Sequence, residues 1–134
     1  MIAHTDIYNI YFDGSIHSVV MEWTGYATST QFREGTELML ETLVLNKASK
    51  VLAEIREMTI IGMEDQQWLQ NDFLPRAINA GFKAIAIIRP ESYFNKVAVE
   101  TVSYKIDSEK LMIRFFDKSE EARQWLHAIE GKNT

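Results

Sequence analysis

Charged side chains inside otherwise apolar stretches are the first candidates for chemistry in this sequence. Glu54 and Arg56 stand two residues apart in the stretch Lys50 to Arg56, and Glu22 stands in the stretch Ile16 to Trp23. An ionised side chain in a strand needs a partner or water, so these residues predict an ion-pair network or a catalytic acid/base pair. Glu54 and Arg56 share one face of their strand, which favours the ion pair. Glu22 joins the network if its strand lies next to the strand that contains Glu54 and Arg56.

Motifs for other kinds of catalysis and for cofactor binding are absent from the sequence. No G-x-S-x-G turn, P-loop or G-x-G-x-x-G motif occurs, and the chain contains no cysteine. The histidines, His4, His17 and His127, fall in a terminus, a hairpin strand and a late helix, without the short spacing of metal ligands. We therefore expect no cofactor, no metal site and no enzymatic activity.

The composition is that of an ordinary globular chain. The 134 residues are 46% hydrophobic and 25% charged, so we expect a single domain over residues 1–134, with a disordered tail at 131–134. The net charge of −5 disfavours binding to nucleic acid. No signal-peptide pattern occurs, and no apolar run approaches the ~18 residues of a membrane span. We expect a cytoplasmic protein.

Alternating apolar residues predict a β-hairpin near the N-terminus. The stretches Asp6 to Phe12 and Ile16 to Trp23 both alternate with a period of two, and Asp13-Gly14 between them is a hairpin turn signal. The stretch Thr28-Ser29-Thr30-Gln31 has the spacing of a capping box, and it predicts a helix that ends near Asn46.

Strands and helices alternate after this first helix. Lys50 to Arg56 predicts a third strand, and a helical region follows from Glu64 to Ala80. Pro75 interrupts that region, so we expect a kink or two short helices. Gly81 is the expected C-terminal cap.

The last third of the chain predicts two further strands and two further helices. Phe82 to Ile88 is almost wholly apolar, as in a strand covered on both faces, and Ser92 begins a third helix. Leu111 to Phe116 is the last strand, and Asp117 caps a final helix. The inner face of this helix consists of Ala122, Trp125, Leu126 and Ile129.

These elements predict an α/β fold with the order ββαβαβαβα. The sheet is mixed and mostly parallel, with about five strands and about four helices, because strand-helix alternation implies right-handed crossovers between parallel strands. The order of the strands within the sheet does not follow from the sequence.

Three stretches of the sequence resemble a known family. The stretches "KAIAIIRP", "WLQNDFLPRAINAGFKAIAII" and "IRFFDKSEEARQWL" are similar to STAS-like proteins, and more narrowly to the SpoIIAA-like branch found in bacteria. The similarity spans Tyr8 to Ile129. It implies a SpoIIAA/STAS-like fold, but similarity of this kind is weakly specific for function.

The anti-sigma-factor antagonists are relatives within the family that the chain resembles. In those relatives a partner kinase phosphorylates a serine at the start of the second helix. Where they have an aspartate followed by two serines, this chain has Gly62, Met63 and Glu64. We therefore expect this phosphorylation switch to be absent. Glu64 either stabilises the helix N-terminus, which we favour, or mimics a phosphorylated residue.

Polar residues at the ends of the predicted strands are the candidate ligand-binding residues. Ligands of α/β proteins gather beyond the carboxyl ends of parallel strands, and arginines there suit a carboxylate or a phosphate. The candidates are Thr24, Arg56, Glu57, Arg89, Glu91 and Asp117. The alternative is that these residues are polar only because loops are solvated. If the sheet is wound in one direction, it has no switch-point crevice, which disfavours a ligand site there.

Large apolar residues around the second helix are the candidate interface. One helix face buries only some of them, so the rest form a homodimer contact, a partner groove or the lid of an apolar pocket, unless all are core. They are Ile60, Ile61, Met63, Trp68 and Phe73.

Our leading hypothesis is a non-enzymatic, STAS-like regulatory or protein-interaction domain that forms a homodimer. The alternative is a carrier of a small apolar or lipid-like ligand. A third hypothesis is an enzyme that uses Glu54 or Glu57 in a closed pocket.

Overall fold

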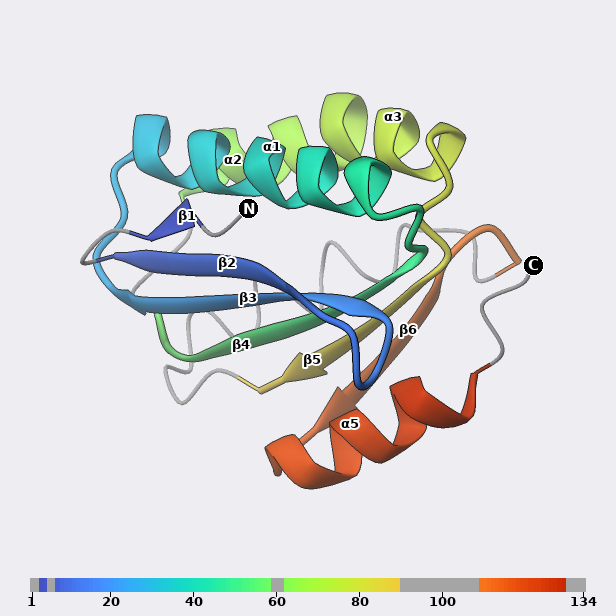
Figure 1. The fold of residues 1–134 in the computed structure, drawn as a ribbon. Helices are drawn as coiled ribbons and strands as arrows, with labels where there is room; N and C mark the ends of the chain where they lie inside the picture. The colour runs from blue at the N-terminus through green and yellow to red at the C-terminus, as the bar shows by residue number, and fades with distance from the viewer. Residues whose placement is uncertain (1–2, 5–6, 59–61, 90–108, 130–134) are drawn as a thin grey trace.

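The described residues of a computed structural model form one sheet with helices on both faces (Figure 1). The structure describes residues 3–4, 7–58, 62–89 and 109–129. The strands are β1 (Ala3–His4), β2 (Tyr8–Asp13), β3 (Ser18–Gly25), β4 (Lys50–Met58), β5 (Ala84–Ile88) and β6 (Met112–Phe116). The helices are α1 (Ser29–Leu45), α2 (Met63–Trp68), the π-helical segment η1 (Leu69–Phe73), α3 (Leu74–Asn79) and α5 (Ser119–Ala128).

The strands lie in the sheet in the order in which they occur along the chain. This order is β1-β2-β3-β4-β5-β6; β1, β2 and β3 pair antiparallel, and β3 to β6 pair parallel. The predicted α/β fold is confirmed, with the two-residue strand β1 added to the expected five. The helix expected from Ser92 lies outside the described residues. Because the order never reverses among the described strands, they form no topological switch point.

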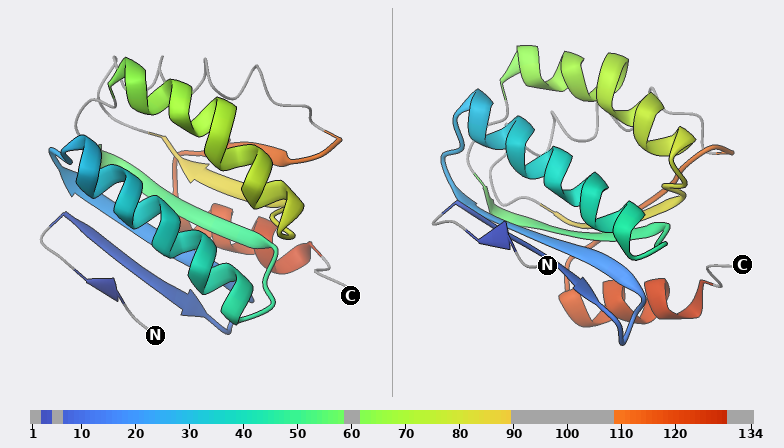
Figure 2. Two further views of the ribbon diagram at one scale, coloured as in Figure 1. Left: turned by 90° about the horizontal axis from the view of Figure 1, so that it is seen from above. Right: turned by 45° about the horizontal axis from the view of Figure 1, so that its top comes forward.

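Helices cover the two faces of the sheet unequally. Figure 2 shows α1, α2 and α3 on one face and α5 on the other. The larger core lies beneath α1 to α3, and Trp23, Phe73 and Phe82 are its largest fully buried side chains. The smaller core lies beneath α5. No helix in the described part of the chain has the length and apolar character needed to cross a bilayer.

The β2–β3 hairpin has a longer loop than its sequence predicts. The return strand begins at Ser18 rather than Ile16, and the left-handed residue is His17, with φ of 47°, rather than Gly14. The Asp13 carboxylate explains the difference, because its Oδ1 accepts hydrogen bonds from the Ser15 N–H and Oγ, at 2.9 and 2.6 Å. These bonds build the loop from the aspartate side chain instead of from a two-residue turn.

The helices on the larger core begin and end largely as predicted. Thr28 and Gln31 form the capping box of α1. Residues 63–79 are helical throughout, and the helix passes through the π-helical turn η1 before Pro75, which stands in the first turn of α3. Gly81, with φ of 115°, follows the C-cap residue of α3.

Helix α5 docks differently from the prediction at its N-terminal end. Its N-cap residue is Lys118, which makes no side-chain capping bond, so the predicted cap at Asp117 is wrong. The Asp117 carboxylate instead accepts from Arg89 Nη1 at 3.2 Å. An ion pair with a neighbouring strand end has replaced a local capping bond.

The C-terminal end of α5 is held by a buried lysine. Lys50, at the start of β4, is only 3% exposed. Its Nζ donates to the carbonyl oxygens of Leu126 at 2.7 Å and Ile129 at 3.1 Å, which are among the last carbonyls of the helix. Burial lowers the pKa of the Lys50 ammonium, since desolvation disfavours the charged form. The helix carbonyls supply the acceptors that the buried group needs.

Candidate functional site

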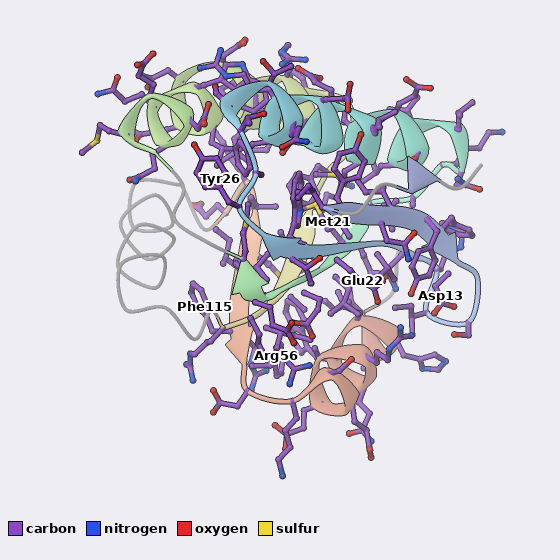
Figure 3. The ribbon with its side chains drawn as sticks, turned by 90° about the vertical axis from the view of Figure 1, so that its left-hand side faces the viewer. Asp13, Met21, Glu22, Tyr26, Arg56 and Phe115 are labelled. Atoms are coloured by element: carbon purple, nitrogen blue, oxygen red, sulfur yellow. The ribbon has the colours of Figure 1, made fainter. Side chains whose placement is uncertain are left out.

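A surface depression lies where β3 leads into α1 and β4 leads towards α2. Its volume is about 510 Å³, and its described lining comes from the start of each helix and the preceding loop. The lining residues are Tyr26, Ala27, Ser29, Gly62, Met63, Glu64 and Asp65. Figure 3 shows Tyr26 on the connection to α1, with Glu22 and Arg56 on the other side of the sheet, towards α5.

Two large apolar side chains of this depression are exposed to solvent. Tyr26 is 64% exposed and Met63 is 67% exposed. Gly25, with φ of 72°, ends β3 in a left-handed conformation and leads the chain out of the sheet directly before Tyr26. Aromatic residues and methionine are enriched in protein interfaces, so this pair makes the depression a candidate binding surface.

A buried carboxylate joins the two helices that border the depression. Asp65, in the first turn of α2, is only 7% exposed. Its Oδ1 accepts from Ser29 Oγ at 2.7 Å and from Arg33 Nε at 3.0 Å, and both donors belong to α1. The Arg33 guanidinium also lies over the Trp68 ring, 5.2 Å from its centre. We refer to Ser29, Arg33 and Asp65 as the interhelix clamp.

Aromatic packing supports the clamp from below. Ring centres are 5.6 Å apart for Trp23 and Phe32, 6.3 Å for Phe32 and Trp68, and 5.4 Å for Trp68 and Phe73. This row of rings runs from β3 through α1 to the helical segment 63–79. Close-packed aromatic side chains resist displacement, so this row stabilises the packing of the helical segment 63–79 beside α1.

The predicted ion pair within a strand is confirmed, but the wider network is different. Arg56 and Glu54 form a bidentate pair, with Nε to Oε1 at 3.0 Å and Nη2 to Oε2 at 2.9 Å. Glu22 is the register partner of Glu54 in the neighbouring strand, as the prediction required. Its carboxylate, however, accepts from Asn9 Nδ2 at 3.0 Å. A neutral amide therefore binds the second carboxylate, and among the described residues no ion pair joins Glu22 to Glu54 and Arg56.

Four of the strand-end residues predicted to bind a ligand lie in two pairs. Thr24 and Glu57 are register partners in β3 and β4, and Arg89 pairs with Asp117. Arg56 forms an ion pair with a carboxylate of its own strand. Glu91 lies outside the described residues. Both arginines already bind carboxylates, and a ligand site at these residues stays a prediction.

The residues predicted to form an interface also divide. Met63 is exposed in the depression, whereas Trp68 is half-buried between the helices. Phe73 is 1% exposed and packs in the larger core, so a second copy cannot contact it in this structure. Ile60 and Ile61 lie outside the described residues. Of the described candidates, Met63 is the residue that a partner can reach most fully.

Tyr26, Ala27 and the three clamp residues were not among the predicted site residues, whereas Gly62, Met63 and Glu64 were compared with the family's phosphorylation site. Tyr26 carried a usable signal, because it is an aromatic residue in a polar loop directly after a strand. Ser29 and Arg33 stand 36 and 32 residues from Asp65, and no local pattern links positions so far apart. Only the docking of α1 beside α2 brings them together.

Comparison with known proteins places the chain in a family. A family model described as SpoIIAA-like matches residues 18–127, which include both chain segments that line the depression. No curated protein and no solved structure matches the chain.

Proposed function

Because the chain belongs to the SpoIIAA-like family, we propose that it is a non-enzymatic regulatory domain that acts by binding another protein. The proposed binding surface is the depression between α1 and α2. The observation that supports it most directly is the exposure of Tyr26 and Met63 on two different chain segments at one edge of the sheet. Side chains of this kind lose the most apolar surface when a partner covers them.

The polar groups of the depression support binding rather than catalysis. Ser29 Oγ and the Asp65 carboxylate are hydrogen-bonded to one another, and Asp65 also holds Arg33. These groups therefore position the helices. A nucleophile would need a base that takes its proton and a group that orients that base, and the clamp aligns no histidine with Ser29.

The start of α2 supports a mode of regulation without phosphorylation at that helix. Its N-cap residue is Gly62, which has no side chain, and Met63 follows. Glu64 and Asp65 already place two carboxylates in the first turn, where they complement the helix dipole. We propose that the partner recognises this helix start, whose negative charge comes from carboxylates and not from phosphorylation. We also propose that Glu64 stabilises the helix.

Site-specific photo-crosslinking tests the proposed surface. A photo-reactive residue replaces Met63, and as a control it replaces Gln124, which is exposed on α5 on the other side of the sheet. In cells that express the chain natively, we expect one defined adduct from position 63 that position 124 does not give. The captured protein is then purified, and Tyr26→Ser and Met63→Ser should each weaken its binding. Identical adducts from both positions, or no effect of either substitution, would exclude this surface.

Self-association is the more specific form of this proposal. If the partner is a second copy of the chain, the adduct has twice the mass of the chain. Sedimentation velocity then shows a dimer that Met63→Ser dissociates. A monomer at all concentrations excludes the homodimer without excluding a different protein partner.

A small apolar ligand is the second candidate function. The volume of about 510 Å³ lies within the range of small-molecule pockets, and Tyr26, Ala27 and Met63 give it an apolar part. Solvent extraction of the purified protein followed by mass spectrometry should then recover a stoichiometric lipid-like molecule. A protein that binds its partner with no extractable ligand contradicts the carrier function.

A further inference from the structure

We propose that the depression between α1 and α2 binds an arginine or lysine side chain from an extended segment of the partner protein. This inference rests on the proposed function and adds the chemistry of the partner. The stem of such a side chain would lie against Tyr26 and Met63, and its cationic head would reach Glu64. Arginine and lysine are the side chains that combine a long apolar stem with a positive tip.

Tyr26 and Met63 supply the apolar part of the proposed site. Both are exposed, both line the same depression, and they come from different chain segments, one before α1 and one at the start of α2. A tyrosine ring also attracts a cation over its face, and a guanidinium stacks on it particularly well. A purely apolar side chain would use the apolar surface of these residues but not the attraction of the tyrosine ring for a cation.

The carboxylates of the depression supply the charged part of the proposed site. Glu64 and Asp65 are the charged residues in its described lining, and both are acidic. Asp65 is already paired with Arg33 in the interhelix clamp. Glu64 is exposed and makes no ion pair with any residue that the structure describes. Among the described residues of the depression, Glu64 is therefore the carboxylate that can pair with a cation of the partner.

An anionic group fits the same place poorly. The first turn of α1 would ordinarily offer free N–H donors to an anion, but the capping box occupies two of its positions. Thr28 Oγ1 accepts from the Gln31 N–H at 3.1 Å, and Gln31 Oε1 accepts from the Thr28 N–H at 2.9 Å. Glu64 would also repel a phosphate or an acidic membrane surface. The local charge and the net charge of −5 act in the same direction.

Peptide titrations test the inference with the whole chain. The probes are glycine- and serine-rich peptides with one central arginine, or with citrulline or glutamate in its place. Citrulline keeps the shape of arginine and removes its charge. Amide chemical shifts of the isotope-labelled chain, followed by NMR, report both the site and the dissociation constant. We expect shifts at residues 26–29 and 62–65, and binding of the arginine peptide about two- to fivefold tighter than the citrulline peptide, as for an exposed ion pair.

Two matched variants identify the carboxylate responsible. Glu64→Gln should abolish the preference for arginine over citrulline. Glu41→Gln, an exposed carboxylate nearer the other end of α1, should keep it. Met63→Ser should weaken both peptides alike, because it removes contact with the stem. The inference is wrong if arginine binds no better than citrulline, if the preference survives Glu64→Gln, or if no peptide shifts these residues.

The outcome separates this inference from the proposed function. If a partner is captured at position 63 and Glu64→Gln leaves its binding unchanged, the proposed binding surface stands. The inference that the partner inserts a basic side chain is then wrong. If position 63 gives no specific adduct but the preference for arginine is retained, the depression binds a basic side chain and the proposed protein partner is excluded. A dimer that Met63→Ser dissociates would show that a second copy occupies the depression, and it supports the inference only if Glu64→Gln dissociates that dimer as well.

Discussion

Gly35→Ala is the substitution whose effect the structure defines most sharply. Gly35 is a buried residue within α1, where alanine would ordinarily stabilise the helix by about 1 kcal/mol. A Cβ built at this position lies 2.5 Å from Trp23 Cη2 and 2.9 Å from Cζ2, well inside van der Waals contact. It also lies 3.1 Å from Tyr8 Cδ2. The absence of a side chain at Gly35 therefore makes room for the indole beneath the helix.

The neighbours of the indole prevent an easy escape. Trp23 is 2% exposed and stacks against Tyr8 at 5.2 Å and Phe32 at 5.6 Å between ring centres. Overpacking of such a core costs about 1–3 kcal/mol, and a contact this short belongs in the upper half of that range. After the gain in helix propensity is subtracted, we expect a net loss of about 1–2 kcal/mol in the free energy of unfolding.

Urea denaturation followed by far-ultraviolet circular dichroism measures this loss. Gly14→Ala is the control, because its Cβ would meet only Phe12 Cε2, at an ordinary 3.9 Å. We expect that control to be neutral or slightly stabilising, since alanine restricts the unfolded chain. Trp23→Phe, which removes the clashing ring atoms, should cost less in the Gly35→Ala background than in the natural chain. A Gly35→Ala variant as stable as the natural chain would refute the reasoning.

Three further predictions concern other contacts. Asp65→Ala should lower stability by about 1–3 kcal/mol and change the Trp68 fluorescence, because Ser29 and Arg33 lose a shared buried acceptor. Hydrogen bonds from Arg123 lower the pKa of Asp13, so the stability from that pair is present above about pH 4 and lost at lower pH. Urea titrations from acid to neutral pH should show this loss, and Asp13→Asn should reduce it. Trp125→Ala should cost about 1–3 kcal/mol by thermal unfolding, less than for a fully buried indole, because Trp125 is half-buried.

The features that the sequence predicted well depend on residues close together in the chain. The capping box needs only Thr28 and Gln31, and the left-handed residue after α3 needs only Gly81. The apolar runs likewise identified every longer strand of the described sheet. Periodicity and capping are local properties, so one sequence is sufficient to locate them.

Side chains that choose between a local and a distant partner were harder to predict. Asp117 has the right position for a helix cap, but the neighbouring strand end brings Arg89 within reach. The indole of Trp125 has helical spacing, but its burial depends on how much of the sheet α5 covers. Within the candidate site, Met63 could be identified from its apolar character, whereas Asp65 could not. Its role arises from the packing of two helices, which a single sequence does not specify.

The buried ammonium of Lys50 has a consequence for the synthesis of the protein. It stands at the start of a central strand, and its acceptors are supplied by residues 76 and 79 positions later in the chain. A nascent chain whose helix α5 is still inside the ribosome must leave this charge hydrated or unpaired. The sheet can therefore complete its interior only after α5 has left the ribosome, and removal of α5 should unfold the central strand with it.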